Sequence, residues 1–277
     1  QLGPSFDLHA GGEDLIFPHH ENEIAQSEAL TGKQFVRHWF HARFLLVEGQ
    51  KMSKSLGNFF TLRDLVLKGH KPSSIRWLLT QVPYRNQLNF TFDGLSAAAS
   101  SVEKLRNFRF RLTSPQFPAG SNAAISQLAA ETAQRVTRAL GDDLNTAEAQ
   151  GAIFEMLRAA NTALDAGQVK QEDGRALLAT LERFDAIFGV LKDDDQPKMK
   201  TILDWARAAQ RDDISPQLEE MAGSAQLSDE DVNRKIAEME AARKARNFKQ
   251  SDAIRGELVG AGIIVENTKD GVRWRRK

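Results

Sequence analysis

The spacing of hydrophobic residues changes along the chain and divides it into regions of different predicted structure. Near the N-terminus, residues 5–8 and 43–47 are short apolar runs of the kind found in strands. The segment between them is typical of a helix that has Pro18 in its first turn and ends near Leu30, before Gly32. The order strand, helix, strand predicts a βαβ unit of a parallel sheet. So short a segment cannot form a doubly wound sheet alone, and we expect partner strands from elsewhere.

The middle of the chain has the hydrophobic period of helices. From Leu62 onward, apolar residues recur at intervals of three and four, as on helices with one buried face. We expect one helix to begin near Pro72, with Ser73 and Ser74 as caps, and another to begin at Asn145. The apolar stripes are interpreted as the core of a helical bundle in preference to a cofactor groove.

The C-terminal part reads as a small separate module. The acidic stretch 193–197 predicts a linker, and residues 231–239 then show a helical pattern with one apolar face. A second short helix is expected over residues 253–259. Residues 263–265 and 272–275 read as two strands joined by a tight turn. The pattern therefore predicts an α+β module.

The composition is that of a globular protein, with 41% hydrophobic and 27% charged residues among 277. No apolar run is long enough to cross a bilayer and no secretory signal is visible, so we expect a cytoplasmic protein with no membrane partner. The absence of cysteine excludes disulfides. The chain opens on Gln1 and lacks an initiator methionine, and we interpret it as a fragment or a processed chain.

Charge is balanced overall but not at the C-terminus. Lysine and arginine number 37, as do aspartate and glutamate, so bulk charge predicts no nucleic-acid partner. The last five residues nevertheless carry four positive charges and one large aromatic side chain: Arg273, Trp274, Arg275, Arg276 and Lys277. This segment is either a solvated basic tail or a nucleic-acid contact.

The first candidate site is the heptapeptide FPHHENE, residues 17–23, in a chain whose six histidines all lie within the first 70 residues. On a helix, His19 and Glu23 are four residues apart and share a face, so both can reach one cation. His20 shares a different face with Ile24, which argues against it as a second imidazole ligand. A histidine and a carboxylate suit zinc, which takes four ligands, so two would be missing. The alternative is an ordinary exposed His–Glu pair.

The second candidate is KMSKS, residues 51–55, directly after a predicted strand. Lys51 and Lys54, beside the hydroxyls of Ser53 and Ser55, form a cationic loop that can close over a polyphosphate and stabilise charge on a departing pyrophosphate. A solvated basic turn is the alternative. The exact pentapeptide after a βαβ unit favours the functional interpretation.

The third candidate is HAGGED, residues 9–14, which follows the first strand. Gly11 and Gly12 allow a ligand to approach the backbone closely, and Asp14 can hold a ribose hydroxyl. A plain strand-to-helix turn explains the same residues, and a glycine pair alone does not decide between the two.

Taken together and in this order, the three motifs resemble the second half of a class I aminoacyl-tRNA synthetase catalytic domain. More narrowly, FDLHAGGEDLIFPHHENEIAQSEA (6–29) followed by HWFHARFLLVEGQKMSKSLGNFF (38–60) is similar to bacterial cysteinyl-tRNA synthetase. The resemblance continues in DDLNT (142–146) and in NFKQSDAIRGELVGAGIIVENTKDGVRWRRK (247–277), and it covers essentially the whole chain.

This resemblance implies a mixed fold: a partial Rossmann-like α/β region, then an α-helical bundle, then a small α+β C-terminal module. The expected domains are the second half of the catalytic domain with the KMSKS loop (1–60), a helical stem-contact region (61–112), a helical-bundle tRNA-binding domain (121–192) and an anticodon-binding module (226–277).

The resemblance also implies a zinc site. In that family zinc is held by two cysteines, a histidine and a glutamate; His19 and Glu23 match the last two. The cysteines, together with a HIGH-type motif that grips ATP, belong to sequence before Gln1. The metal then binds the substrate thiolate, which separates cysteine from serine.

Further roles follow from the same match. Lys54 and Lys51 would act in catalysis by neutralising the transferring phosphates, with Ser53 and Ser55 also at the ATP. Gly11, Gly12 and Asp14 would lie near the adenosine, although Ala10 departs from the glycine often found there. At the C-terminal end, Trp274 would stack on a base of the transfer RNA, and Arg273, Arg275 and Arg276 would reach its backbone or base edges.

The implied activity is cysteine–tRNA ligation, in which ATP with Mg²⁺ activates L-cysteine as cysteinyl-adenylate before transfer to tRNA(Cys). We expect a monomeric parent protein, and we expect this chain to be inactive alone. Two alternatives stay open. One is a non-catalytic tRNA-binding fragment or paralogue, because the chain offers no cysteine ligand. The other is the related cysteine ligase of mycothiol synthesis, against which the GVRWRRK end argues because that enzyme has no anticodon to read.

Overall fold

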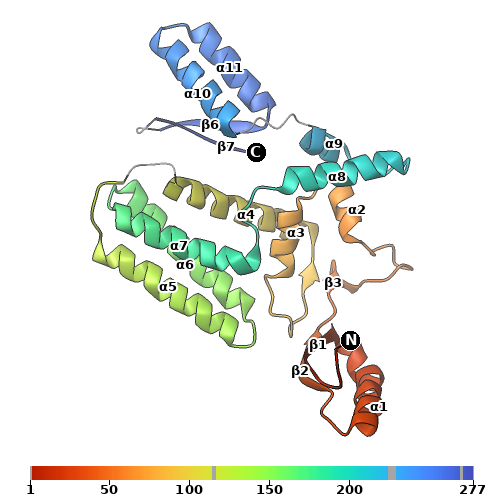
Figure 1. Ribbon diagram of the computed structural model, residues 1–277. Coiled ribbons are helices and arrows are strands. Elements are labelled where there is room, and N and C mark those ends of the chain that lie inside the picture. The colour runs from red at the N-terminus through yellow and green to blue at the C-terminus, as the bar shows by residue number, and fades with distance from the viewer. Residues whose placement is uncertain (1, 114–116, 224–228, 269–270, 277) are drawn as a thin grey trace. The chain divides into compact units, whose positions relative to one another are not determined.

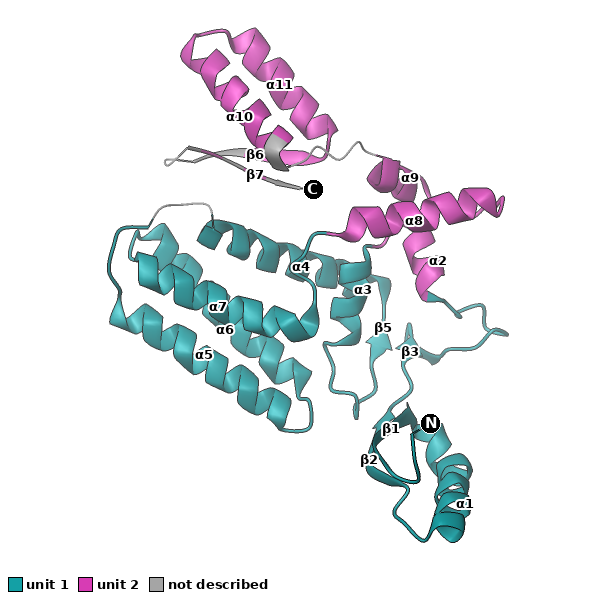
Figure 2. Cartoon of the chain, in the orientation of Figure 1, with its two compact units in different colours: residues 1–61, 71–193 teal, residues 62–70, 194–277 magenta. Residues whose placement is uncertain are grey.

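The computed structural model describes residues 2–113, 117–223, 229–268 and 271–276 (Figure 1). The chain divides into two compact units (Figure 2). One consists of Gln1–Thr61 and Lys71–Asp193, and the other of Leu62–His70 and Asp194–Lys277. The segment 62–70 thus belongs to the second unit although the sequence of the first surrounds it.

The first unit begins with a βαβ arrangement (Figure 1). β1 (Phe6–Gly12) and β2 (Val36–Ala42) are parallel neighbours that pair along their whole length. Between them lies α1 (Glu21–Thr31), which ends at Gly32 in the left-handed conformation with φ of 63°. Glycine adopts this conformation without steric cost, so it commonly follows the last helical residue.

The partner strand of β1 differs from the one predicted. We expected residues 43–47, but β2 precedes them, and only β3 (Leu46–Val47) within that apolar run is a strand. β2 has the sequence VRHWFHA, in which only Val36 is buried. Its histidines and arginine interrupt the run of apolar residues from which a strand is predicted.

A second small sheet holds the strands that follow. β3 pairs antiparallel with β4 (Gln50–Lys51) and parallel with β5 (Asn89–Phe90). The β3–β4 turn consists of Glu48 and Gly49, with φ of 50° and 76°. Two-residue hairpins favour positive φ at both positions, because the resulting twist matches that of the strands.

Among the described residues of the first unit, the remaining helices are α3 (Pro72–Leu79), α4 (Phe92–Thr113), α5 (Ala123–Gly141), α6 (Thr146–Asp165) and α7 (Gln171–Phe188). Helices α4 to α7 lie together as a bundle (Figure 1). Its interior contains large side chains that are almost fully buried, among them Leu105, Phe108, Ile153, Met156, Leu177, Leu181 and Phe184. The bundle core predicted from the apolar stripes is confirmed.

The helix starts were predicted with mixed success. Asn145 caps α6 as expected, because its side chain accepts a hydrogen bond from the Glu148 backbone N–H. The serine caps of α3 were wrong. Pro72 is the first helical residue and Lys71 precedes it, so Ser73 and Ser74 fall within the first turn and are buried.

The second unit contains α2 (Leu62–Leu67), α8 (Asp195–Ala208) and α9 (Pro216–Gly223), followed by the C-terminal module. The guanidinium of Arg63 lies 3.9 Å from the ring centroid of Trp205, which connects α2 with α8. The linker predicted at residues 193–197 is mostly helical, because α8 begins at Asp195.

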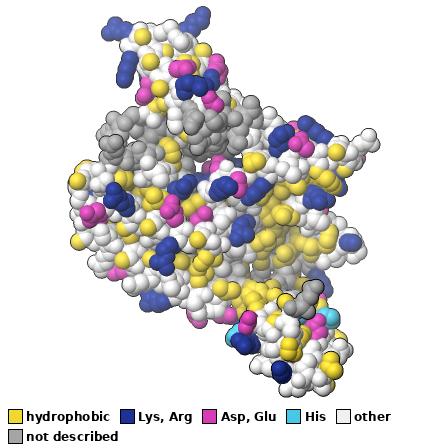
Figure 3. Space-filling model, viewed as in Figure 1, with side chains coloured by type: hydrophobic (Ala, Val, Ile, Leu, Met, Phe, Trp, Pro, Cys, Tyr) yellow, Lys and Arg dark blue, Asp and Glu magenta, His cyan; other side chains and the backbone are white. Residues whose placement is uncertain are grey.

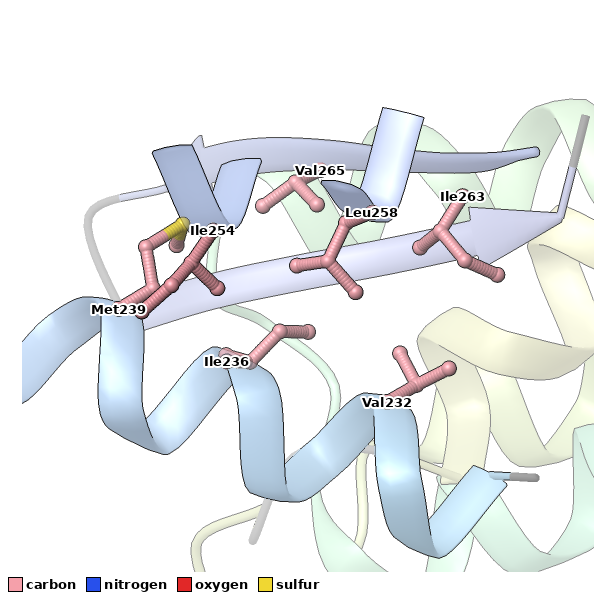
Figure 4. Packing of buried hydrophobic residues seen from close by; sticks show 7 residues of the cluster. All are labelled: Val232, Ile236, Met239, Ile254, Leu258, Ile263 and Val265. Carbon is pink, nitrogen blue, oxygen red and sulfur yellow. The ribbon is translucent and has the colours of Figure 1, made fainter. Parts of the chain in front are cut away.

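The C-terminal module is the expected α+β unit. α10 (Asp229–Lys244) and α11 (Phe248–Gly260) pack on the antiparallel pair β6 (Ile263–Thr268) and β7 (Gly271–Arg276). Figure 4 shows the core between the helices and β6, made of Val232, Ile236, Met239, Ile254, Leu258, Ile263 and Val265. The predicted apolar face of the first helix is thus confirmed.

The βαβ part buries little of its own apolar surface. Leu8, Phe17 and Leu30 are exposed at 60%, 77% and 87%, and apolar side chains are visible on this lobe in Figure 3. This exposure fits the expectation that the unit takes further strands from elsewhere. Within the described ranges, no helix is long and apolar enough to span a membrane.

Candidate active site

The candidate active site lies where β1 and β2 run side by side. In the parallel register His9 is opposite Trp39, and Gly11 is opposite His41. After β1 the chain makes a short turn over Glu13–Leu15 and a wider helical turn over Ile16–His20 before α1 begins. This connection brings FPHHENE back toward the two strands.

The Glu23 carboxylate is shared by two histidines. One oxygen, Oε2, lies 2.8 Å from His9 Nε2, and the other, Oε1, lies 3.3 Å from His19 Nε2. The Glu23 side chain is 31% exposed and that of His19 is 61% exposed. The predicted i,i+4 contact of His19 with Glu23 is therefore present, and His9 joins it from β1.

His20 lies inside this cluster, beneath the more exposed His19. It is 3% exposed, and its Nδ1 lies 2.8 Å from His41 Nε2. Its ring centroid is 4.8 Å from both the His9 and the Trp39 centroids. Burial, and next the neighbouring His9, lower the pKa of His20 below its ordinary value. The neutral imidazole that this favours is the form that binds metals.

The structure and the sequence thus favour different partners for Glu23. Among the described residues, one group of histidines and carboxylates has the spacing of a metal site: His9, His20 and Glu23, with one ligand atom from each lying within 4.8 Å of the others. The sequence-based assignment of His19 with Glu23 stays a prediction. His20 was set aside on α-helical spacing, but Ile16–His20 is not a regular α-helix, so that spacing does not apply.

His9 and His41 were not identified from the sequence. Their approach depends on the pairing of β1 with β2, and β2 was not predicted. The available signal was the clustering of all six histidines in the first 70 residues.

The paired glycines have contacts of their own. A Cβ added to Gly11 would lie 2.7 Å from His20 Cε1 and 2.9 Å from Leu15 Cδ1, so the strand must lack a side chain where the buried imidazole crosses it. A Cβ on Gly12 would lie 2.4 Å from Oδ1 of the exposed Asp14. The predicted adenosine contacts of Gly11, Gly12 and Asp14 stay predictions.

The KMSKS loop begins at β4 and is closed by one side chain. Asn58 Oδ1 accepts from the Ser53 N–H at 2.8 Å, and its Nδ2 donates to the Lys51 carbonyl at 3.1 Å. The Ser53 and Ser55 hydroxyl oxygens are 2.9 Å apart. Asn58 was not identified from the sequence as a site residue, although it lies only three residues after the motif.

Both lysines of the motif rest against aromatic rings. Lys51 Nζ lies 5.5 Å from the Phe44 ring centroid, and Lys54 Nζ lies 5.7 Å from that of Phe59. A cation–π contact at such a site is weak, on the order of 0.5–1 kcal/mol. A polyphosphate can therefore draw the ammonium groups away at small cost.

At the C-terminal end, Trp274 is partly buried against the module core, and its Nε1–H donates to Asn233 Oδ1 at 2.8 Å. The indole edge is therefore occupied, and base stacking would have to use the exposed part of the ring. The side chains of Arg273, Arg275 and Arg276 lie outside the described residues, so their predicted contacts stay predictions.

Comparison with known proteins gives two family matches. Residues 1–100 match the model of the class I (C) tRNA synthetase catalytic domain, and residues 135–192 match the DALR domain. The chain is 61% identical over its full 277 residues to a cysteine–tRNA ligase of Koribacter versatilis, covering 56% of that protein. It is 50% identical to the cysteine–tRNA ligase of Solibacter usitatus, covering 53% of it. The chain thus spans about half the length of the curated relatives it matches.

Solved structures support the fold. Mycobacterium tuberculosis methionyl-tRNA synthetase in complex with methionyl-adenylate aligns with 72% of this chain and 43% of its own, with a TM-score of 0.51 and 22% identity. At this level of identity the likeness shows the fold alone. It agrees with the predicted combination of a partial Rossmann-like region and a helical module. The matched domains, together with identity along the whole of this chain, show that it is homologous to part of the cysteine–tRNA ligases and carries a class I (C) tRNA synthetase catalytic domain over residues 1–100.

Proposed function

We propose that the protein carrying this chain attaches cysteine to tRNA(Cys) with ATP, through a cysteinyl-adenylate. The observation that carries the proposal is 61% identity to a cysteine–tRNA ligase across all 277 residues. The βαβ part supplies a cluster of metal-binding residue types, and the following strands supply a cationic loop, so two of the functions that the reaction needs lie in one compact unit.

In this proposal the chain contributes one side of the amino-acid site. Neutral imidazoles and a carboxylate are ligands that zinc accepts, and the donors around Glu23 fit that chemistry. When bound there, zinc would supply preference for a thiolate over a hydroxyl. The remaining ligands would come from the additional length that the relatives have.

The loop residues would act on the nucleotide. Lys51 and Lys54 would leave their phenylalanine rings and neutralise charge on the phosphates of Mg-ATP, with the Ser53 and Ser55 hydroxyls donating hydrogen bonds. Asn58 would keep the loop closed on itself until the nucleotide arrives.

The helical parts would hold the transfer RNA. We assign residues 61–112 to stem contact, 121–192 to tRNA binding and 226–277 to the anticodon. The DALR match over residues 135–192 lies within the second of these segments. The exposed face of Trp274 would stack on a base, since its N–H is already bonded to Asn233.

The function is tested with the protein extended to the length of its relatives. We expect cysteine-dependent exchange of pyrophosphate into ATP and charging of cysteine tRNA, and we expect neither activity from residues 1–277 alone. Exchange by the 277-residue chain would contradict the assignment of an essential part outside it. Binding of tRNA without exchange by the extended protein would favour the alternative, a non-catalytic RNA-binding paralogue.

The metal ligands are tested by elemental analysis of the same extended protein. Glu23→Gln should lose zinc, because Glu23 lies in both candidate ligand sets. If the resemblance assigns the histidine correctly, His19→Ala should also lose it while His9→Ala keeps it; the reverse result would favour the geometric group. His38→Ala, an exposed histidine on β2 outside the cluster, is the matched control.

A further inference from the structure

Residues 80–88 join α3 to β5 and contact three other parts of the first unit; we call them the bridge segment. At its start, the Thr80 carbonyl accepts from Gln150 Nε2 at 2.9 Å, and Gln150 is a buried residue of α6. At its end, the Leu88 carbonyl accepts from the Leu46 N–H of β3 at 2.8 Å. The bridge segment therefore contacts both the helical bundle and the strands near the candidate active site.

Tyr84 lies in the middle of the bridge segment and contacts both sides at once. Its ring stacks on Phe40 of β2, with centroids 3.9 Å apart and planes 26° from parallel. Its carbonyl accepts from the Arg43 N–H at 2.9 Å. Its hydroxyl donates to Asp143 Oδ1 at 2.6 Å, and the Arg85 guanidinium binds the same carboxylate.

The turn that carries Asp143 has an uncommon backbone. Between α5 and α6, Asp143 and Leu144 have φ of 52° and 56°, a left-handed conformation that side chains with a Cβ disfavour. The Asn145 N–H donates to the Ala139 carbonyl at 2.9 Å, and its side chain caps α6, so the turn is held in this shape. Strained non-glycine residues persist where the surroundings fix them, and often at functional positions.

The strand beyond Phe40 leads to the candidate active site. The next residue of β2 is His41, whose Nε2 lies 2.8 Å from His20 Nδ1. A series of contacts thus runs from the α5–α6 turn through Asp143 and Tyr84 to Phe40, which directly precedes His41 of the histidine cluster along β2. An exposed ion pair such as Arg85–Asp143 stabilises little by itself, so the series depends on the ring stack and on the tyrosine hydroxyl.

We propose that Tyr84 and Asp143 form a latch that couples the helical bundle to β2 and positions that strand for transfer of cysteine to tRNA. The inference rests on the proposed function and names a device within it. Adenylate formation uses cysteine and ATP without the RNA, so it does not require the bundle to be coupled to β2. In the transfer step, the RNA held by the bundle must meet the aminoacyl group beside β2. Transfer therefore does require the bundle to be coupled to β2.

A spectroscopic test uses the 277-residue chain and needs no activity. Tyr84 is the sole tyrosine of the sequence, so tyrosinate absorbance near 295 nm reports this residue alone. Its hydrogen bond to Asp143 raises its pKa above the ordinary value of 10.0. Asp143→Asn should lower that pKa toward the ordinary value, whereas Glu148→Gln should not change it. Glu148 is the matched control because its carboxylate forms an ion pair with Arg135 of α5, whereas that of Asp143 binds Tyr84 and Arg85 of the bridge segment.

The kinetic test uses the protein extended to the length of its relatives. Tyr84→Phe keeps the ring stack but removes the hydroxyl, and Asp143→Asn keeps a residue that tolerates the left-handed turn. Both should lower kcat for charging by about 5–10-fold, the lower part of the usual range of coupling between sites. The KM for tRNA and the rate of pyrophosphate exchange should stay within about twofold, and Glu148→Gln should behave as the unsubstituted protein.

Several results would overturn the latch. One is a Tyr84 pKa at its ordinary value in the unsubstituted chain. The others concern the Tyr84→Phe and Asp143→Asn variants: an equal loss of pyrophosphate exchange and charging, a change confined to the KM for tRNA, or no loss of charging at all. Absence of both activities in the unsubstituted protein would instead reject the proposed function. In that case the tyrosinate titration still decides whether the Tyr84–Asp143 contact forms.

Discussion

Replacing Gly11 by alanine tests whether the strand β1 is shaped around the buried His20. The new Cβ would lie 2.7 Å from His20 Cε1 and 2.9 Å from Leu15 Cδ1, closer than carbon atoms approach in proteins. His20 is 3% exposed and is held by His41, so it has little room to move. Gly12→Ala is the matched control, because its Cβ meets only the carboxylate end of the exposed Asp14, which can rotate away.

The change in the free energy of unfolding caused by Gly11→Ala is the sum of two opposing effects. Forcing an extra methyl group into a packed site costs about 1–3 kcal/mol. Alanine in place of glycine stabilises the folded chain by about 0.4–1 kcal/mol, because it restricts the unfolded chain. This gain applies at Gly11 because its φ is not positive, so alanine can adopt the same backbone conformation. The net loss is therefore about 0.5–2 kcal/mol, concentrated in β1 and β2. At roughly 1.4 kcal/mol for each factor of ten, local opening should become about 2–30-fold more frequent.

Hydrogen–deuterium exchange measured by mass spectrometry resolves the affected segments. We expect faster exchange in peptides from β1 and β2 of the Gly11→Ala chain, with α5 to α7 unchanged, and nearly normal exchange for Gly12→Ala. The double variant Gly11→Ala/His20→Ala should be less destabilised than the two single changes added together, because the small residue removes the clash. Equal effects of the two glycine substitutions, or strict additivity in the double variant, would refute the reasoning.

Three further predictions concern other parts of the chain. Leu258→Ala removes a fully buried side chain of the C-terminal core and should destabilise that module by about 2–5 kcal/mol in urea denaturation followed by circular dichroism, whereas the exposed neighbour Val259→Ala should cost little. Asn58→Ala should speed trypsin cleavage within the KMSKS loop, and an unchanged rate would contradict its closing role. Because the hydrogen bond to Asp143 raises the pKa of Tyr84, the unfolded chain releases this proton first, so stability should fall as pH rises above 10; Tyr84→Phe should lack this component.

Much of the fold could be predicted because local pattern and burial agree. The apolar stripe of Val232, Ile236 and Met239 indicated a helix, and these side chains do form one side of the C-terminal core. Asn145 likewise caps α6, because capping is a contact between residues close in sequence. Prediction failed where pairing between distant segments decided the structure, as for β2, whose polar sequence has only one buried residue.

The candidate site, like the fold, could be predicted from the sequence only in part. The sequence by itself determined the residue types and their local spacing: a histidine four residues before Glu23, two lysines three residues apart, and a pair of glycines, which were expected after the first strand but form the end of β1. Tertiary structure alone decided that His9 approaches Glu23, that His41 supports His20, and that Tyr84 links Phe40 to Asp143. The physical reason is that sequence spacing fixes contacts within about one helical turn, whereas contacts across 10 to 60 residues depend on how strands pair and helices pack.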